Sequence, residues 1–179
     1  KIKYGISEVN RLNNLVDQLL LLARYENQFQ NLKTEKVYLN ALILDILTRY
    51  SLKMNSQKIR VNPTFSNEYY VESDNYLVSI IIGNIISNAI KYSNENGEIS
   101  ISLSNNETHT ICSISDNGIG IPKEDLDKIM NPFFRSDPTQ HPDIKGSGLG
   151  LSIVRRLTDL LNIQLEIQSK INNGTTAIL

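Results

Sequence analysis

The heptapeptide Asp116-Asn117-Gly118-Ile119-Gly120-Ile121-Pro122 decides how the rest of the chain is interpreted. The preceding residues, 110–115, alternate in polarity and predict a strand with Cys112 and Ile114 on one face. A carboxylate therefore follows directly on a strand. Two glycines permit positive φ and close backbone approach, which suits a flat ligand whose N–H donors face Asp116. An ordinary turn remains the alternative for this stretch alone, because Asp-Asn-Gly is a common turn sequence.

The composition bounds the class of protein. The chain has 179 residues, of which 40% are hydrophobic, so it can bury one core and one attached element. With a formal net charge of -1 and no basic stripe, it is not predicted to bind nucleic acid. A single cysteine excludes a disulfide framework and a cysteine-cluster metal site. No apolar run approaches the length of a membrane span.

Residues 1 to about 27 predict one amphipathic helix. Its apolar side chains recur close to heptad spacing at Ile2, Ile6, Val9, Leu12, Val16, Leu19 and Ala23. So wide a stripe needs other helices to cover it, which favours a helical dimerisation bundle over packing on the following domain. The polar residues 27–36 mark a boundary, so we predict two domains, 1–30 and 31–179. The chain begins inside the helical pattern, and we expect it to be part of a longer protein.

The second domain alternates helical and strand patterns. Helices are predicted at 37–54, 75–92, 123–130 and 151–161, and strands at 59–63, 69–72, 98–104, 109–115, 163–169 and 175–179. We expect the first two strands to pair as a hairpin, and the last two to be joined by a turn at 172–174. The predicted fold is a two-layer α/β sandwich, a mixed sheet of about five strands with three helices on one face, preceded by one helix of a bundle.

The helix predicted over residues 75–92 carries one polar stripe. It begins after Ser73-Asp74, a capping pair, and Asn84, Asn88 and Lys91 recur at i, i+4 and i+7. A solvated surface stripe is the alternative, although asparagine is a weak helix former. The functional interpretation is that Asn88 offers an amide oxygen to a hard cation and Lys91 offers a point charge to phosphate.

Three alternating glycines, Gly146, Gly148 and Gly150, open the helix predicted from residue 151. Free backbone N–H groups and the positive end of a helix dipole meet at such a point, which suits phosphate. The spacing is neither a dinucleotide fingerprint nor a Walker loop, because no strand precedes it and no Gly-Lys-Ser/Thr follows. A flexible hinge is the alternative.

Several segments, in this order, resemble one family. Residues 84–93, 116–122 and 146–150 are similar to the asparagine box and two glycine boxes of the bacterial sensor histidine kinases, members of the Bergerat-fold ATPase superfamily. Phe133-Phe134-Arg135 resembles their phenylalanine box, and Gly174-Thr175 their last glycine-threonine pair. The resemblance extends over essentially the whole chain, since residues 8–26 are similar to the second helix of the dimerisation and phosphoacceptor hairpin.

The resemblance implies a role for each matched residue. Asp116 would accept the adenine amino group, Asn88 would hold Mg²⁺, and Lys91 would reach the phosphates. Arg135 would approach the γ-phosphate. The other residues implied to contact ATP, from the base to the phosphates, are Tyr92, Gly118, Gly120, Ile121, Gly146, Ser147, Gly148, Leu149, Gly150 and Thr175.

Asn84 distinguishes between reaction classes. Superfamily members that hydrolyse ATP or phosphorylate serine place a glutamate one helical turn before the magnesium asparagine, where it serves as a base. Asn84 has no basicity, so the residues favour a histidine acceptor, which is nucleophilic when neutral. Asn84, Lys91 and Arg135 are the candidate catalytic residues. A chaperone- or topoisomerase-like ATPase and a degenerate regulatory nucleotide-binding module remain the alternatives.

One departure from the family concerns the phosphoacceptor. The chain has only His109 and His141, and neither is followed by the acidic residue expected on an amphipathic helix. The resemblance therefore implies the catalytic part of an ATP-dependent protein-histidine kinase that binds ATP and Mg²⁺ without autophosphorylating in its own chain. It further implies a homodimer through the N-terminal bundle, a response regulator as partner, and a cytoplasmic position in a parent attached to the membrane only through upstream segments.

Overall fold

The computed structural model describes residues 16, 20, 32–136, 144 and 146–179. Contacts divide the chain into two units, Lys1–Leu32 and Lys33–Leu179. The helix predicted over residues 1–27 lies outside the described residues except at Val16 and Leu20, which are helical. Its proposed part in a dimerisation bundle therefore stays a prediction.

A mixed sheet of five strands, in the order β2-β4-β5-β7-β6, forms one layer of the second unit. The strands are β2 (Arg60–Phe65), β4 (Glu98–Asn105), β5 (Thr110–Asp116), β6 (Glu166–Lys170) and β7 (Gly174–Ile178). β2 runs parallel to β4, and each of the other neighbouring pairs is antiparallel. The prediction of a mixed sheet of about five strands is confirmed.

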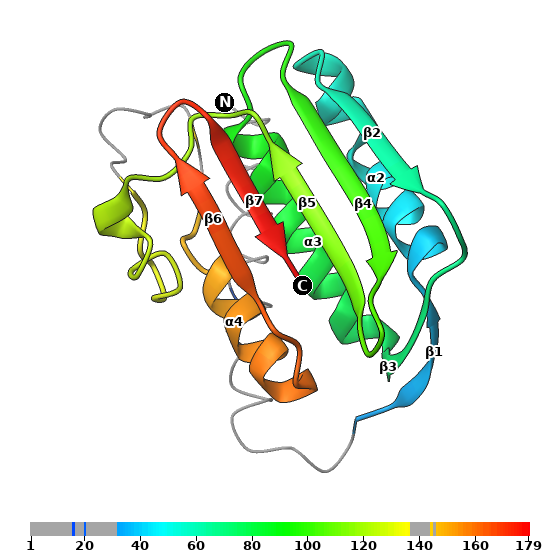
Figure 1. Cartoon of the computed structure of the whole chain (residues 1–179). Helices are drawn as coiled ribbons and strands as arrows, with labels where there is room; N and C mark the ends of the chain where they lie inside the picture. Colours follow the sequence, from blue (N-terminus) through cyan, green and yellow to red (C-terminus); the bar gives the residue numbers. More distant parts are fainter. Residues whose placement is uncertain (1–15, 17–19, 21–31, 137–143, 145) are drawn as a thin grey trace. The chain divides into compact units, whose positions relative to one another are not determined.

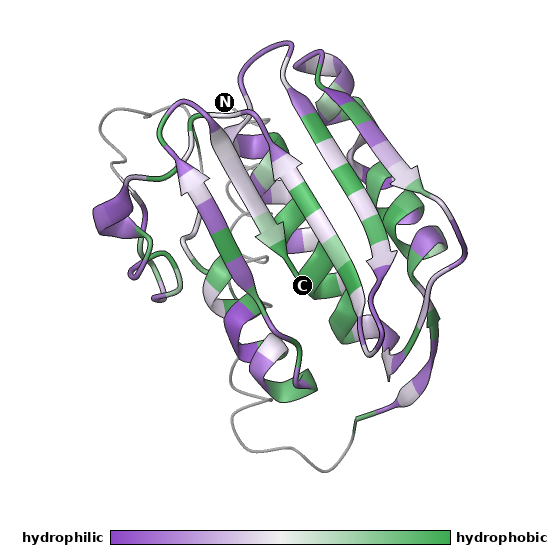
Figure 2. Cartoon of the chain, in the orientation of Figure 1, coloured by the Kyte–Doolittle hydropathy of each residue, from purple (hydrophilic) through white to green (hydrophobic). Residues whose placement is uncertain are grey.

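Three helices form the second layer and cover one face of this sheet (Figure 1). They are α2 (Leu39–Ser56), α3 (Asn75–Tyr92) and α4 (Gly150–Leu161). Strand β4 shows why the sheet has one covered face: Ile99, Ile101 and Leu103 are buried, while the serines between them are exposed. Figure 2 shows this alternation along the strand. The two-layer sandwich predicted from residue patterns is therefore confirmed.

Strand pairing outside this sheet differs from the prediction. β1 (Thr34–Tyr38) and β3 (Tyr70–Asp74) form a separate antiparallel pair, with Val37 opposite Val71. The predicted hairpin of residues 59–63 with 69–72 is wrong, because β2 pairs with β4 instead. β1 is mostly polar, so its sequence did not predict a strand, and the helix predicted from residue 37 begins at Leu39.

The helix predicted over residues 123–130 is only partly formed. Pro122 precedes a single 3₁₀ turn, η1 (Lys123–Asp125), and turns continue to Met130. Proline before the first turn agrees with the prediction. So short a segment offers too few apolar side chains for tertiary packing to stabilise a longer helix.

Asp74 determines where α3 begins. Its buried carboxylate accepts a hydrogen bond from the Leu77 N–H at 3.1 Å, which caps the helix as predicted. The other carboxylate oxygen accepts the N–H of Lys33 at 3.1 Å. One side chain therefore caps the helix that carries the polar stripe and also fastens the residue that precedes β1.

Replacing Asp74 by alanine should lower the free energy of unfolding by about 1–3 kcal/mol, because the helix loses its cap and the Lys33 N–H loses its acceptor. Asp74→Ser is the control, since serine keeps the cap and should recover part of the loss. Urea unfolding followed by circular dichroism measures both variants. An alanine variant as stable as the wild type would contradict this role.

Candidate nucleotide-binding site

Asp116 is the last residue of β5, the central strand, which ends on the same side of the domain as α3 (Figure 1). Its carboxylate accepts the Gly118 N–H at 2.9 Å and a backbone hydrogen bond from Thr175, the residue opposite it on β7. Burial raises the pKa of Asp116 above its ordinary value, and these two backbone hydrogen bonds partly offset the effect. A carboxylate has about four acceptor positions, so Asp116 keeps some for a ligand.

The glycine turn after Asp116 is held against two neighbouring elements. The Ile119 N–H donates to the Tyr92 carbonyl at 3.1 Å, which ties the turn to the end of α3. A Cβ on Gly118 would collide with the same carbonyl, and Gly120, at φ +70°, lies against the carbonyl of Lys170. Side chains at either glycine would push the turn away from α3 or β6, so both positions require glycine.

The stripe on α3 reaches this turn. Asn84, Asn88 and Lys91 are all partly buried, and Asn84 Nδ2 donates to the Ile80 carbonyl at 2.9 Å. No hydrogen bond joins the Asn88 side chain to another described residue, so its amide oxygen is open to a ligand. Lys91 Nζ lies 3.1 Å from the Tyr92 hydroxyl and 4.6 Å from the centre of that ring.

The glycines that precede α4 lie beside the same stripe. A Cβ on Gly150 would come within 2.9 Å of Asn84 Oδ1, and a Cβ on Gly146 would collide with Lys91 Nζ. The first residues of α4 have no side-chain cap, so their N–H groups are open to an anion. The structure therefore brings the asparagine stripe and the glycine segment together, as the sequence predicted.

The segment around Gly148 is fastened to the predicted phenylalanine box. Gly148 has φ +75° and accepts the Phe133 N–H at 3.0 Å through its carbonyl. Its α-carbon lies against the Phe133 backbone, with no room for a side chain. Ser147 Oγ accepts the Leu149 N–H at 3.2 Å, which shapes the same turn.

Arg135 is not joined to the α3 stripe. Its Nη2 donates to the Ile144 carbonyl at 2.6 Å, and no hydrogen bond links it to Asn84, Asn88 or Lys91. The polar residues 137–143 and Lys145, which follow it in sequence, lie outside the described residues. A γ-phosphate contact for Arg135 stays a prediction.

Sequence patterns missed three residues around this site. Asn117 Oδ1 accepts the Glu98 N–H at 2.8 Å and so holds the turn after β5. Ser169 on β6 accepts the Ile121 N–H at 2.9 Å and lies 2.8 Å from the Thr175 hydroxyl. Burial and the charge of Lys91 lower the pKa of Lys53, which lies in the last turn of α2. Asn117 belongs to the heptapeptide, but its bond to β4 cannot be read from that motif; Ser169 and Lys53 belong to no local motif, so only strand and helix pairing reveals them.

Among the described residues, no group of three or more His, Cys, Asp or Glu side chains is arranged to hold a metal ion. Mg²⁺ commonly takes one or two protein ligands and completes its octahedron with phosphates and water. The open amide oxygen of Asn88 fits that donor set.

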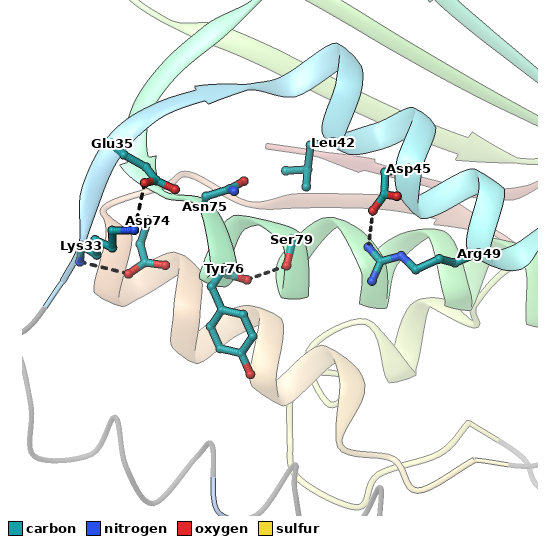
Figure 3. Close-up of a pocket in the computed structure, with 9 residues that line it drawn as sticks. All are labelled: Lys33, Glu35, Leu42, Asp45, Arg49, Asp74, Asn75, Tyr76 and Ser79. Atoms are coloured by element: carbon teal, nitrogen blue, oxygen red, sulfur yellow. Dashed lines mark hydrogen bonds and ion pairs between the residues drawn. The ribbon is translucent and has the colours of Figure 1, made fainter.

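A separate hollow of about 420 Å³ lies at the opposite end of α3 (Figure 3). It is lined by Lys33, Glu35, Leu42, Asp45, Arg49, Asp74, Asn75, Tyr76 and Ser79. Four of its charged side chains form ion pairs, with Lys33 Nζ 3.3 Å from Glu35 and Arg49 3.3 Å from Asp45, and Asp74 accepts two backbone N–H groups. At 1.5 Å per residue, Asn75 is about 24 Å along the helix from Lys91, so this hollow is distinct from the predicted site.

A carboxylate at a strand end, an asparagine stripe on a helix and glycines at a helix start therefore lie at one end of this two-layer α/β sandwich. Residues 73–179 match the family model described as histidine kinase-, DNA gyrase B-, and HSP90-like ATPase. This match takes in more than half of the chain, and the chain belongs to this ATPase family.

Within the family, its relatives are sensor histidine kinases. Sensor histidine kinase WalK of Bacillus subtilis is 30% identical over 172 residues, which are 95% of this chain and 28% of WalK. Sensor protein kinase GraS of Staphylococcus aureus is 33% identical over 174 residues, 96% of this chain and 49% of GraS. The chain thus spans half or less of the length of these relatives.

Solved structures agree with this placement. The nucleotide-free catalytic domain of histidine kinase ThkA superposes with a TM-score of 0.71 at 30% identity, over 82% of this chain and 93% of that domain. ThkA in complex with the response regulator TrrA matches with a TM-score of 0.75 at 26% identity, over 95% of this chain and 47% of ThkA. In the described part of the present chain, no helix is both long and apolar enough to cross a membrane.

Proposed function

We propose that this chain is the catalytic and ATP-binding part of a two-component sensor histidine kinase. It transfers the γ-phosphate of ATP to a histidine on a partner helix, for relay to a response regulator. The observation that carries the proposal is the hydrogen bond from the Ile119 N–H to the Tyr92 carbonyl, which holds the turn after Asp116 against the end of α3, the helix that carries Asn88 and Lys91. The sequence relatives support the same assignment.

Different residues of the site bind different parts of ATP. Asp116 accepts the adenine amino group, Gly118 and Gly120 form the floor of the base pocket, and Tyr92 flanks the base. Thr175, on β7 opposite Asp116, forms another side of the base pocket. The backbone of Ile121 lines the pocket next to the glycine turn. Ser147 and Leu149 form the turn before α4, and the uncapped N–H groups of the first residues of α4 face the phosphates.

Phosphoryl transfer rests on positioning and on charge. Asn88 and the phosphates would hold Mg²⁺, which when bound neutralises phosphate charge. Lys91 Nζ, beside Gly146, adds a second positive charge at the start of the glycine segment. Arg135 reaches the γ-phosphate once it leaves the Ile144 carbonyl.

Asn84 favours a kinase over an ATPase. It stands where a hydrolytic relative would carry a glutamate, and its amide is fixed by the bond to Ile80. A neutral amide does not deprotonate water, whereas a neutral imidazole acceptor needs no base. Slow hydrolysis and transfer to histidine are therefore expected.

The partners follow from the same assignment. Residues 1–30 form part of a helical hairpin that dimerises with a second copy, and the receiver domain of a response regulator takes the phosphate. ThkA is solved in complex with such a regulator, which supports this choice. We assign the chain to the cytoplasmic portion of a membrane-attached parent.

Calorimetric titration with ATP in the presence of Mg²⁺ tests the binding part of this proposal. A peptide carrying the family's acceptor helix, incubated with the chain and γ-labelled ATP, tests the transfer part. We expect saturable ATP binding, label on the peptide that is lost in acid, and little free phosphate. Rapid ATP hydrolysis without peptide labelling would favour the ATPase alternative. Folded protein that binds no adenine nucleotide would favour the degenerate module.

A further inference from the structure

Three polar side chains lie in one row across β5, β7 and β6. The strand registers place Asp116 opposite Thr175, and Thr175 opposite Ser169. Neighbours in such a row point to the same face of a sheet. Ile114 and Ala177, two residues along from Asp116 and Thr175, are buried under the helices. The row therefore faces the helix layer, at the end of the sheet where the base is proposed to bind.

Ser169 makes three hydrogen bonds. Its hydroxyl donates to the Gly174 carbonyl at 2.8 Å and accepts the Ile121 N–H at 2.9 Å. Its third contact, at 2.8 Å, is with the Thr175 hydroxyl. A serine hydroxyl has a single proton. Since that proton goes to Gly174, the Thr175 hydroxyl must donate to Ser169.

The direction of this bond determines what Thr175 offers a ligand. With its proton directed to Ser169, Thr175 Oγ1 presents only lone pairs. Asp116, whose carboxylate is otherwise occupied by backbone N–H groups, also presents only acceptors. The pocket wall formed by these two residues therefore accepts hydrogen bonds and donates none from its side chains.

We infer that Ser169 is a positioning residue for base recognition: it fixes the Thr175 hydroxyl as an acceptor, so the site selects a base with an amino group over one with a carbonyl. This inference rests on the proposed ATP site. Adenine carries an amino group at its sixth position, whereas hypoxanthine and guanine carry a carbonyl oxygen that would face two acceptors. A site built to hydrogen-bond one ligand rejects an analogue because the buried polar groups of the site and the analogue are then left without partners.

The test compares ATP with inosine triphosphate by calorimetry on wild type and Ser169→Ala. Inosine triphosphate has a carbonyl in place of the amino group and a proton on the neighbouring ring nitrogen, and both differences are the same for wild type and variant, so the change in the affinity ratio reports the altered protein. Without Ser169 the Thr175 hydroxyl is free to turn and donate to the carbonyl. The ratio of ATP affinity to inosine triphosphate affinity should fall by about tenfold, the equivalent of about 1.4 kcal/mol. Ser169→Thr, which keeps a hydroxyl, should retain the wild-type ratio.

A structural role alone predicts a different result. Ser169→Ala also removes the acceptor of the Ile121 N–H, and a loosened loop would weaken both nucleotides equally and leave their ratio unchanged. In a Thr175→Val background, the Ser169→Ala change should no longer alter the ratio, because its effect passes through the Thr175 hydroxyl.

The chain supplies a matched control. Ser115 on β5 and Thr176 on β7 form a similar hydroxyl pair, 2.8 Å apart, on the opposite face of the sheet. Ser115→Ala should leave the ratio at its wild-type value. If wild type binds ATP and folded Ser169→Ala keeps the same ratio, the inference is wrong while the proposed function stands. If wild type binds neither nucleotide, the proposed function itself fails.

Discussion

Replacing Asp116 by asparagine is expected to weaken ATP binding severely and to change how the stability of the protein depends on pH. The carboxylate already accepts N–H groups from Gly118 and Thr175, so an amide in its place has one acceptor atom too few. Its NH₂ group must then face a backbone N–H or the adenine amine. Hydrogen bonds to a charged group contribute about 1.5–3 kcal/mol, so the affinity should fall by about 10- to 150-fold.

The stability of this variant follows from the raised pKa of Asp116. Burial disfavours the ionised carboxylate, so the wild type carries a cost at neutral pH that asparagine removes, while asparagine leaves one of the two backbone N–H groups without an acceptor. The difference between the two proteins that depends on pH comes from Asp116 alone. As the pH falls through the raised folded pKa toward the ordinary value of 3.8, the native protein takes up a proton before the unfolded chain does. The wild type therefore gains stability relative to Asp116→Asn as the pH falls through this window.

Nucleotide binding should change in the opposite direction over the same window. Protonation removes acceptor capacity from Asp116, so ATP affinity should fall while the free energy of unfolding rises relative to the variant. Thermal unfolding and calorimetry between neutral and mildly acidic pH measure the two quantities. Asp159→Asn, at an exposed ion pair on α4, is the control and should leave ATP binding unchanged. Tight ATP binding by Asp116→Asn would contradict the assigned role.

Replacing Asn88 by alanine is expected to remove the Mg²⁺ dependence of ATP binding. The Asn88 amide has no partner among the described residues, so the substitution breaks no hydrogen bond in the free protein. Alanine is also the better helix former, by roughly 0.5 kcal/mol, so α3 should be no less stable. The wild type should bind ATP at least tenfold more tightly with Mg²⁺ than with EDTA, and the variant should show no such difference.

Asn75→Ala is the matched control for this experiment, because Asn75 lies on the same helix at its opposite end. It should retain the full Mg²⁺ effect. Calorimetry in Mg²⁺ and in EDTA measures both variants, and the peptide-transfer assay should detect no transfer by Asn88→Ala. A variant that keeps the wild-type Mg²⁺ dependence would remove Asn88 from the metal site.

Local sequence patterns by themselves determined most of the elements and the outline of the site. The α3 boundaries follow from the Asp74 cap and an apolar run, and the β4–β5 hairpin follows from strict alternation. Asp116, Asn88 and Gly150 were identified because each occupies a definite place in its own element: a strand end, a helical stripe or a helix start. Such signals are local, since propensity, capping and periodicity act within a few residues.

Pairing over long sequence distances was decided only by the tertiary structure. β2 pairs in parallel with β4 rather than with β3. The polar strand β1 forms because its backbone hydrogen-bonds to β3. Ser169 becomes part of the site only through its register with Thr175, and Asp116 acquires its raised pKa only through burial. Burial, strand register and the distance between charges depend on residues that are far apart in the sequence and that only the fold brings together. The residue pattern of a single segment therefore cannot predict them.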